Sequence, residues 1–450
     1  MSKTIRIRKG LDLRLKGEAE KVIVQADPPG VVDIKPTDFH GLTPKVLVKP
    51  GQEVKAGMPL FRDKYNERVL FASPVSGEVA DVIRGDKRKV LAVRIIADKE
   101  TRYQEFGPAD PAKMDRGAII ERLLESGCWP FIRQRPFDVV ADPAQEPRDI
   151  FISAFDTRPL AADLDLVVRN NGAELQAGLD VLAKLTKGRV HLGLSDRTAA
   201  REFLDAKNVQ HDTFKGPHPA GNVGVQIHHT APINKGEVVW TTGVQDVMVI
   251  GRLFLTGHFD ATRTVAVTGS EARNPKYHRT LIGAPVKDLI GDVEPGVRVV
   301  SGDPLSGSNV GVDGHLGFYD TQLTLLPEGD EPKFFLTDGW LSPGLNKLSA
   351  SHAYPSWLMP GKRYAPDTNQ NGEERAFVMS GQYEAVFPFD IYPVHLLKAI
   401  LVNDIEQMEN LGLLEVAPED FALCEFVCTS KIESQAIVRE GLDVLKKETT

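Results

Sequence analysis

The sequence predicts a multidomain protein of mixed α and β structure, in which strands come first, an α/β region follows and helices close the chain. Its 450 residues are 42% apolar and 26% charged, which suits three or four domains of about 100–200 residues, each with its own core. Short strands separated by turn dipeptides come first, and strands alternate with helices after them. We expect four units, at residues 1–102, 103–258, 259–330 and 331–450.

The first unit carries two related strand–turn patterns. Pro50-Gly51 lies between the apolar strands of residues 46–60, and Ser76-Gly77 lies between those of residues 72–79. Such paired half-motifs resemble the flattened β-barrels of biotinyl and lipoyl domains. We therefore expect N-terminal strands followed by a barrel-sandwich domain.

Biotinyl and lipoyl domains carry their prosthetic arm on a lysine in an exposed hairpin, and Lys64 occupies a comparable place before Ser73. The connection between these two residues is longer than the hairpin of carrier domains, and it contains Arg68. A swinging-arm carrier with a modified Lys64 is thus one alternative function. An unmodified, exposed lysine is the favoured interpretation.

The second unit alternates helices and strands. Apolar residues recur at helical spacing in residues 118–124 and 174–185. Apolar runs predict strands at residues 149–153, 190–194, 238–240 and 247–250. This order predicts a crossover sheet of Rossmann-like shape. No two of the 39 glycines are spaced as Gly-x-Gly, so the dinucleotide-binding fingerprint is missing, and no P-loop is present. If NADH or flavin serves this protein, we expect another polypeptide to carry it.

The third and fourth units differ in their predicted secondary structure. Residues 264–314 combine short strands, one helical turn and glycine-rich turns, a β-grasp-like pattern of the SLBB type. A polar, Pro- and Gly-rich stretch follows, and then helices dominate. Pro393 is placed to begin a helix, and Ser430 with Glu433 predicts a capping box for a last helix ending near Lys446.

Composition excludes several classes of protein. The formal net charge of −8 argues against nucleic-acid binding. We expect no secretory signal at the N-terminus and no membrane span, because the most apolar stretch, residues 238–257, contains Asp246 and Arg252. Three cysteines are too few for a disulfide framework and indicate a reducing compartment.

No set of residues is spaced as a metal site. Cys424 and Cys428 stand four residues apart, but the third cysteine, Cys128, lies far upstream, and iron–sulfur clusters normally need four thiolates. We interpret the pair as buried structural thiols. His228 and His229 fall in an expected strand, where adjacent side chains face opposite ways and cannot chelate one ion.

Segments along the whole chain resemble one family. They are residues 3–15, 40–60, 72–79, 216–224 (Gly-Pro-His-Pro-Ala-Gly-Asn-Val-Gly) and 424–433 (Cys-Glu-Phe-Val-Cys-Thr-Ser-Lys-Ile-Glu). Because they span both ends and the middle, a single shared domain does not explain them. The chain is similar to the A subunits of the sodium-translocating NADH:quinone oxidoreductases, the bacterial respiratory sodium pumps.

The resemblance implies one subunit of an enzyme that passes electrons from NADH to a ubiquinone-type quinone and exports sodium ions. It implies a peripheral position on the cytoplasmic side of the bacterial inner membrane, against membrane and membrane-attached subunits that carry flavins and an iron–sulfur centre. It further implies that this chain binds no cofactor tightly, has no catalytic residue of its own and contacts at most a quinone. Cys424 and Cys428 would then be the remnant of a lost cluster site.

A quinone ring needs an apolar slot with polar groups for its carbonyl oxygens. Within residues 128–137, three aromatic side chains accompany two guanidinium groups that can stack on a ring or donate to a carbonyl; these are Trp129, Phe131, Arg133, Arg135 and Phe137. The competing interpretation is a buried aromatic anchor with surface arginines. If the quinone hypothesis is right, Phe131→Ala weakens the binding of quinone analogues.

A second candidate quinone contact is the loop that contains His218, Gly221 and Gly224, which we expect to lead into a strand. Besides a quinone-contacting subunit, three functions stay open. They are a carrier modified on Lys64, a stand-alone flavin or nicotinamide oxidoreductase, which the missing Gly-x-Gly disfavours, and a purely structural scaffold.

Overall fold

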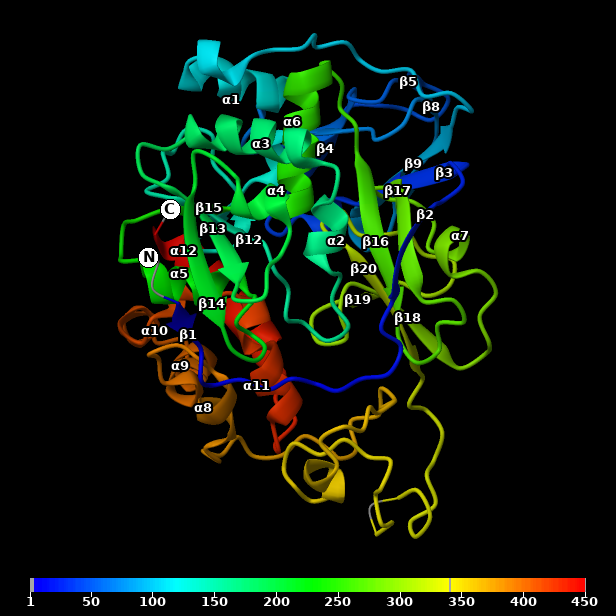
Figure 1. Cartoon of the computed structure of the whole chain (residues 1–450), viewed down its shortest axis with the longest axis vertical. Coiled ribbons are helices and arrows are strands. Elements are labelled where there is room, and N and C mark those ends of the chain that lie inside the picture. Colours follow the sequence, from blue (N-terminus) through cyan, green and yellow to red (C-terminus); the bar gives the residue numbers. More distant parts are fainter. Residues whose placement is uncertain (1–3, 340, 450) are drawn as a thin grey trace.

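The computed structural model describes residues 4–339 and 341–449, and within them the chain forms four β-sheets and a C-terminal group of helices (Figure 1). The sheets contain seven, six, four and three strands. The mixed α and β multidomain class that the sequence predicts is therefore confirmed.

Two small sheets form the predicted barrel-sandwich. The strands are β3 (Val31–Ile34), β4 (Pro44–Val46), β5 (Glu53–Val54), β6 (Pro59–Asp63), β7 (Leu70–Ala72), β8 (Gly77–Arg84) and β9 (Val90–Ala97). Their order is β3-β9-β8-β5 in one sheet and β4-β6-β7 in the other. Phe61 and Phe71 stack in the core with ring centroids 4.8 Å apart. Gly77 has a φ of 153°, and a Cβ there would lie 1.9 Å from the carbonyl oxygen of Ile96, so only glycine fits this close approach.

The two N-terminal strands lie outside the barrel-sandwich. β1 (Ile5–Arg6) pairs with β14 (Gln210–Lys215), and β2 (Glu20–Gln25) pairs with β17 (Lys276–Leu281). The blue N-terminal segment in Figure 1 therefore runs across the molecule and joins two distant sheets. The alternating pattern of a strand does not show which other strand it will pair with, because pairing is decided by tertiary packing.

The seven-stranded sheet belongs to the α/β unit. Its order is β1-β14-β13-β12-β15-β10-β11, with β1, β14, β13, β12 and β15 parallel. The remaining strands are β10 (Arg133–Arg135), β11 (Val139–Val140), β12 (Ile150–Ser153), β13 (Val190–Ser195) and β15 (Val239–Thr241). The helices are α1 (Arg116–Glu125), α2 (Leu164–Val168), α3 (Gly172–Ala183), α4 (Arg201–Leu204), α5 (Val223–Thr230) and α6 (Val244–Thr256). The helices predicted at residues 118–124 and 174–185 are α1 and α3.

Two of the predicted strands are wrong. Residues 247–250 belong to helix α6, and the run that contains His228 and His229 belongs to helix α5. Short apolar runs fit a buried helix as well as a strand, and only their packing decides between them. Helix α6 ends at Gly257, whose left-handed φ of 80° favours glycine.

A six-stranded sheet follows, in the order β19-β18-β20-β16-β17-β2. Its further elements are β16 (Thr262–Thr268), α7 (Lys287–Ile290), β18 (Val297–Ser301), β19 (Ser308–Asn309) and β20 (Gln322–Pro327). The strand β20 was not predicted from the sequence. It lies between β18 and β16, and it supplies Leu323 and Leu325 to a separate small core.

Helices form the C-terminal end. They are α8 (Gln382–Val386), α9 (Pro393–Leu401), α10 (Ile405–Asn410), α11 (Ala422–Val427) and α12 (Ser434–Thr449). Pro393 lies in the first turn of α9, as predicted. The predicted capping box is wrong, because the Ser430 hydroxyl donates to the carbonyl oxygen of Ala376 and the helix begins at Ser434. Among the described residues, no helix is both long enough and apolar enough to cross a bilayer.

Candidate functional site at the carboxyl edge of the α/β sheet

The carboxyl ends of the parallel strands meet at one edge of the seven-stranded sheet. From β12 the chain moves outward to β13 and β14, and it then returns to β15 on the other side of β12. The connections therefore diverge between β12 and β15. In open α/β sheets, the crevice at such a switch point is where ligands bind.

The chain's own side chains fill this switch point. At the N-terminus of α6, the backbone N–H of Gly243 donates to the Asp246 carboxylate over 3.2 Å. The same carboxylate pairs with the guanidinium of Arg263, and both side chains are buried. A helix N-terminus of this kind can bind a phosphate, but an internal carboxylate takes that position.

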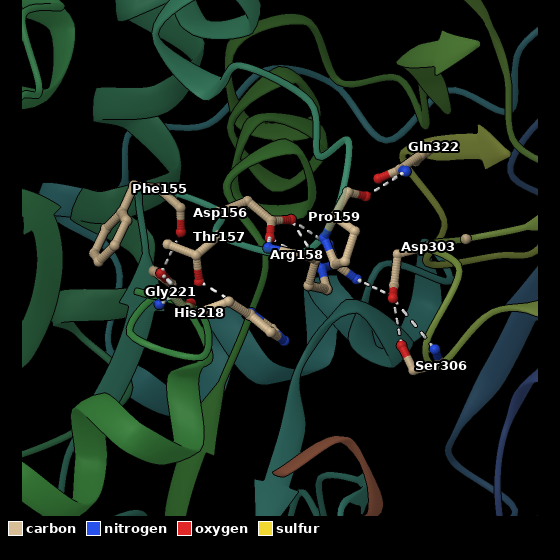
Figure 2. Close-up of polar contacts among 12 residues, drawn as sticks. Phe155, Asp156, Thr157, Arg158, Pro159, His218, Gly221, Asp303, Ser306 and Gln322 are labelled. Atoms are coloured by element: carbon tan, nitrogen blue, oxygen red, sulfur yellow. Dashed lines mark hydrogen bonds and ion pairs between the residues drawn. The ribbon is translucent and has the colours of Figure 1, made fainter. Parts of the chain in front are cut away.

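A polar network joins the loops that follow β12 and β14. The Thr157 hydroxyl lies 3.1 Å from His218 Nδ1, and it accepts a hydrogen bond of 2.9 Å from the backbone N–H of Gly221 (Figure 2). The Ser153 hydroxyl donates to the carbonyl oxygen of Gly221 and accepts from the Gln226 amide. Burial lowers the pKa of His218 to about 4, so its imidazole is neutral at pH 7.

Arg158 connects this network to the six-stranded sheet. Its guanidinium pairs with Asp156 and lies 3.5 Å from Asp303 (Figure 2). Burial alone would raise the pKa of Asp156, but the adjacent guanidinium holds that pKa below its ordinary value. Asp303 also accepts hydrogen bonds from the backbone N–H and the hydroxyl of Ser306. The loops of two units are therefore fixed to each other at this edge.

Of the predicted loop residues, the structure brings His218 and Gly221 into this network. Gly224 lies in helix α5 and not before a strand, so that expectation is wrong. A Cβ at Gly224 would lie 2.6 Å from Oδ2 of Asp420. This glycine therefore allows the C-terminal region to approach the α/β unit closely.

The predicted aromatic and arginine residues are divided between the core and this edge. Trp129 and Phe131 are fully buried in the short 3₁₀ helix η4 (Trp129–Phe131). The Trp129 indole donates to the carbonyl oxygen of Ala141, and the Phe131 ring stacks on Phe318 with centroids 4.9 Å apart. Both side chains pack as interior residues of the largest core.

Arg133 and Arg135 enter a charged cluster. The Arg133 guanidinium lies 5.0 Å from the ring centroid of Tyr319, which is a cation–π contact. Arg135, which is 1% exposed, pairs with Glu419 at 2.8 Å and with Asp420 at 3.5 Å. Burial alone would lower the pKa of Arg135, but Asp138 and these two carboxylates raise it above its ordinary value. Neither arginine is a plain surface residue.

Phe137 is the predicted residue that lines a cleft. The cleft has a volume of about 260 Å³ and lies where β6, β7, the β10–β11 hairpin and α12 meet. Phe71, Phe137 and Val139 give it an apolar wall. His40 and Gln134 supply polar groups, and His40 Nε2 lies 2.8 Å from the Asp443 carboxylate.

The cysteines and the paired histidines have structural neighbours. Cys424 and Cys428 are both buried and free, and the backbone N–H of Ile432 donates to the sulfur of Cys428. His228 Nδ1 lies 2.8 Å from Glu415, and His229 Nε2 lies 2.9 Å from the carbonyl oxygen of Pro388. Across residues 4–339 and 341–449, no group of three His, Cys, Asp or Glu side chains could hold a metal ion.

Sequence reasoning missed Asp156, Arg158, Asp303, Glu419 and Asp420. Charged residues of these types are frequent on protein surfaces, and they follow no fixed spacing. Asp303 stands in a Gly-Asp-Pro turn, a signal for a loop but not for a buried carboxylate. Only the folded chain shows that they are neighbours.

Comparison with known proteins finds family models that match three parts of the chain. The family model described as the NqrA N-terminal barrel-sandwich hybrid domain matches residues 5–98. The NqrA second alpha/beta domain matches residues 114–259, and the NQRA C-terminal domain matches residues 264–311. A solved NAD+-reducing [NiFe]-hydrogenase aligns with 47% of the chain at 15% identity and a TM-score of 0.35, which is too low to carry an argument.

Curated relatives match over the full length. The A subunit of the Na(+)-translocating NADH-quinone reductase of Alcanivorax borkumensis is 39% identical, and the match covers 99% of this chain and all of the relative. The protein of the same name from Vibrio vulnificus is 37% identical with the same coverage. The family expected from the sequence is therefore confirmed: the chain belongs to the family of the A subunits of the Na(+)-translocating NADH-quinone reductases.

Proposed function

We propose that this chain is a peripheral, cytoplasmic-side subunit of a sodium-pumping NADH:quinone oxidoreductase, and that it provides shape and docking surface. The flavins and the iron–sulfur centre are then carried by membrane and membrane-attached partner subunits. The single observation that carries the proposal is the match to the A subunits of these reductases, at 39% identity over 99% of the chain. Asp246 and Arg263 support the cofactor-free role, because they occupy the position at the sheet edge that a nucleotide phosphate would take.

The experiment is isolation of the tagged chain from native membranes in mild detergent. The chain is expected to co-purify with its membrane partners. After separation by a chaotrope, flavin absorbance and iron analysis should locate the flavins and the iron in the partner fraction. Neither flavin nor iron should be found in stoichiometric amount on this chain. A yellow or brown chain with stoichiometric prosthetic group would overturn the proposed division of labour.

Intact mass measurement tests the carrier alternative in the same preparation. Lys64 is exposed in the turn between β6 and β7, and its ammonium group lies 5.5 Å from the ring of Tyr65. Such a turn suits a modified lysine as well as a plain one. We expect the unmodified mass, and an added lipoyl or biotinyl group would favour the carrier.

We further propose that this chain contacts a quinone at the cleft lined by Phe137. The ring of Phe137 and the polar groups of His40 and Gln134 offer the apolar wall and the hydrogen-bonding groups that a quinone needs. Phe137→Ala is expected to weaken the binding of a quinone analogue in isothermal titration. Phe131→Ala, the change favoured by the sequence alone, is expected to lower stability instead, because its ring is fully buried. Unchanged affinity of the Phe137 variant would end the proposal.

For the units themselves, we propose a Rossmann-like α/β unit at residues 103–258 and a β-grasp unit of the SLBB type at residues 259–330. A linker with a helical unit at residues 331–450 completes the chain. The crossover from β12 through α3 to β13 supports the first assignment. The small separate core of the six-stranded sheet supports the second.

A further inference from the structure

The positive charge of the barrel-sandwich is concentrated in one turn. Residues 31–98, which contain β3 to β9, hold 12 basic and 9 acidic side chains. Four of these basic residues and one of the acidic residues lie at residues 84–89 (Arg-Gly-Asp-Lys-Arg-Lys), and the rest of the segment holds eight of each sign. We call residues 84–89 the basic turn. It joins β8 to β9, and it carries the whole excess positive charge of residues 31–98.

The cations of the basic turn are not neutralised by the protein. All four are exposed, and none forms an ion pair with a carboxylate of the residues that the structure describes; they are Arg84, Lys87, Arg88 and Lys89. Other arginines of the barrel-sandwich are paired: Arg62 lies 2.7 Å from Glu67, and Arg94 lies 2.8 Å from Asp33. The charge of the basic turn therefore acts on the solvent and on whatever surface approaches it.

The backbone of the turn holds two of these cations in a conformation that does not favour them. Lys87 has a φ of 51° and a ψ of 27°, and Arg88 has a φ of 62°. The backbone N–H of Lys89 donates to the carbonyl oxygen of Asp86 over 3.1 Å, which closes a type I′ turn. The two central residues of such a turn favour Asn-Gly, because a longer side chain is strained at positive φ. A binding role for Lys87 and Arg88 explains why cations are placed there at this cost.

An exposed leucine lies at the base of the turn. Leu91 of β9 is 38% exposed, and a Cβ at Gly85 would lie 3.0 Å from its Cδ1 atom, so the leucine packs directly against Gly85. The Arg84 guanidinium donates to the carbonyl oxygen of Arg88 over 3.1 Å and links the two ends of the turn. The basic turn thus presents several cations beside one aliphatic side chain. Protein segments of this composition bind to the headgroup layer of anionic membranes.

The size of the turn selects among anionic occupants. A stable protein–protein interface uses about 20–30 residues on each side, and a six-residue turn offers far less. An anionic lipid surface needs no complementary shape, because its potential attracts each Lys or Arg that comes close to it. The small area and the high charge density of the basic turn therefore favour a lipid surface over an acidic protein.

The acidic part of the chain lies away from the turn. The whole chain has a formal net charge of −8, and residues 382–449 hold 13 acidic and 5 basic side chains. In Figure 1, helices α8 to α10 of this segment lie at the lower left, whereas β8 and β9 lie at the upper right. Charges farther apart than the Debye length, about 8 Å at physiological ionic strength, are largely screened. The acidic helices therefore do not prevent the basic turn from meeting an anionic surface.

We propose that the basic turn binds the headgroups of anionic phospholipids on the membrane at which the complex assembles. The four cations lie among the lipid phosphates, and Leu91 enters the headgroup layer. Binding by the isolated chain is weak, because only a few cations take part. In the complex, contacts with partner subunits hold the turn close to the lipid at a high effective concentration. This inference rests on the proposed peripheral position, and it adds a direct contact with lipid.

The test measures co-sedimentation of the purified full-length chain with vesicles at millimolar lipid concentration. Vesicles of phosphatidylcholine alone are compared with vesicles that also contain phosphatidylglycerol. We expect binding to the mixed vesicles only, at about 0.1 M salt, and its loss at about 1 M salt. Lys87→Asn/Arg88→Gly removes two cations and introduces the pair that the turn favours, so this variant should fold. Its partition onto the mixed vesicles should fall about tenfold or more.

The matched control removes two cations from the same domain. It is Lys49→Gln/Lys55→Gln, which changes exposed lysines on either side of β5. Strand β5 pairs with β8 at Gly77 and Glu78, and the basic turn lies at the opposite end of β8. The distance along the strand is about 20 Å, which exceeds the Debye length, so this control should bind the mixed vesicles as the wild type does.

A second variant keeps the test independent of the turn conformation. Arg84→Gln/Lys89→Gln removes two cations and leaves the central residues of the turn unchanged, and its partition should fall to the same extent. Thermal unfolding of each purified chain shows that it is folded. Equal partition of the wild type and both folded variants would overturn the lipid contact, as would a wild-type chain that does not bind the mixed vesicles.

Recovery of partner subunits from native membranes separates the remaining outcomes. If the variants bound vesicles as the wild type does but recovered fewer partner subunits, the turn would contact an acidic protein surface, and the proposed lipid contact would be overturned. If the wild-type chain bound the mixed vesicles but recovered no membrane subunit, the proposed function would fail while the lipid contact stood. The two proposals therefore fail in distinguishable ways.

Discussion

The guanidinium of Arg135 lies 2.8 Å from the carboxylate of Glu419, although 284 residues separate them in the chain. Arg135 is in strand β10, and Glu419 is in the 3₁₀ helix η7 (Pro418–Phe421) that leads into α11. Asp420, next to Glu419, approaches the same guanidinium in the interior. The contact joins the edge of the α/β sheet to the C-terminal helices.

Replacing Arg135 should therefore loosen the C-terminal helices. Arg135→Gln removes the buried cation beside Glu419 and Asp420, and breaking a buried pair on one side costs about 3–5 kcal/mol. Urea unfolding should show this loss in the free energy of unfolding. Arg133→Gln is the control, since the Arg133 side chain is 30% exposed and should cost less. Equal losses for the two variants would show that burial of the pair is not the cause.

Because the pKa of the His218 imidazole is lowered, we expect the protein to lose stability in mild acid. Burial lowers its folded-state pKa to about 4 from an ordinary value of 6.5, so the unfolded chain binds the proton more readily. Stability is fully present above pH 6.5 and is lost as the pH falls toward 4, by up to about 3 kcal/mol.

Urea unfolding between pH 4 and 8 measures this dependence. His218→Gln should flatten the slope of the unfolding free energy in the window from pH 6.5 to 4. The exposed His395, changed to Gln, should leave the slope as it is. A slope unaffected by the His218 change would rule out this histidine as its source.

The contribution of Asp38 to folding stability should have the opposite pH dependence. Burial raises the folded-state pKa of this carboxyl to about 6 from 3.8, even though the backbone N–H of Phe318 donates to it over 2.9 Å. The folded chain therefore holds the proton more tightly, and stability falls as the pH rises from 3.8 to 6. Asp38→Asn removes this cost and should stabilise the protein above pH 6 by on the order of 2 kcal/mol. Thermal unfolding at pH 7 measures this gain in stability. Asp27→Asn, at an exposed position, is the neutral control. A less stable Asp38→Asn protein would contradict the assignment.

Two glycines allow α3 and α6 to pack backbone against backbone. A Cβ at Gly251 would lie 1.8 Å from the carbonyl oxygen of Glu174 and 3.0 Å from the backbone nitrogen of Gly178. Gly251→Ala must therefore push the helices apart, at a cost of about 3 kcal/mol in the free energy of unfolding. Gly117→Ala in α1 meets no atom closer than 3.4 Å, and it should stabilise by about 0.5–1 kcal/mol. If Gly251→Ala left the free energy of unfolding unchanged, the two helices could move apart without cost.

Much of the fold was accessible from local patterns. The helices α1 and α3 follow from apolar residues at helical spacing, and the barrel-sandwich follows from its repeated turns. Residues 247–250 were misassigned as a strand because a short apolar run satisfies either structure until its neighbours are known. The strand β20 was not predicted from the sequence.

The candidate site was accessible only in part. His218 and Gly221 were singled out because their loop is one of the segments that resemble the family, and the structure places both in the polar network. Arg158 and Asp303 were missed, since their contact joins residues 145 positions apart and neither position stands out locally. Trp129 and Phe131 were predicted to contact a quinone because they are aromatic, but both side chains are buried in the hydrophobic core.

The amino-acid order by itself determined the family and the mixed fold class, because these depend on composition, periodicity and matching motifs along the chain. Only the tertiary structure decided that β1 and β2 join distant sheets, that Arg135 meets Glu419, and that Asp246 pairs with Arg263 at the edge of the α/β sheet. Those relationships arise from contacts between residues remote in the sequence, and their free energy exists only when the chain has folded.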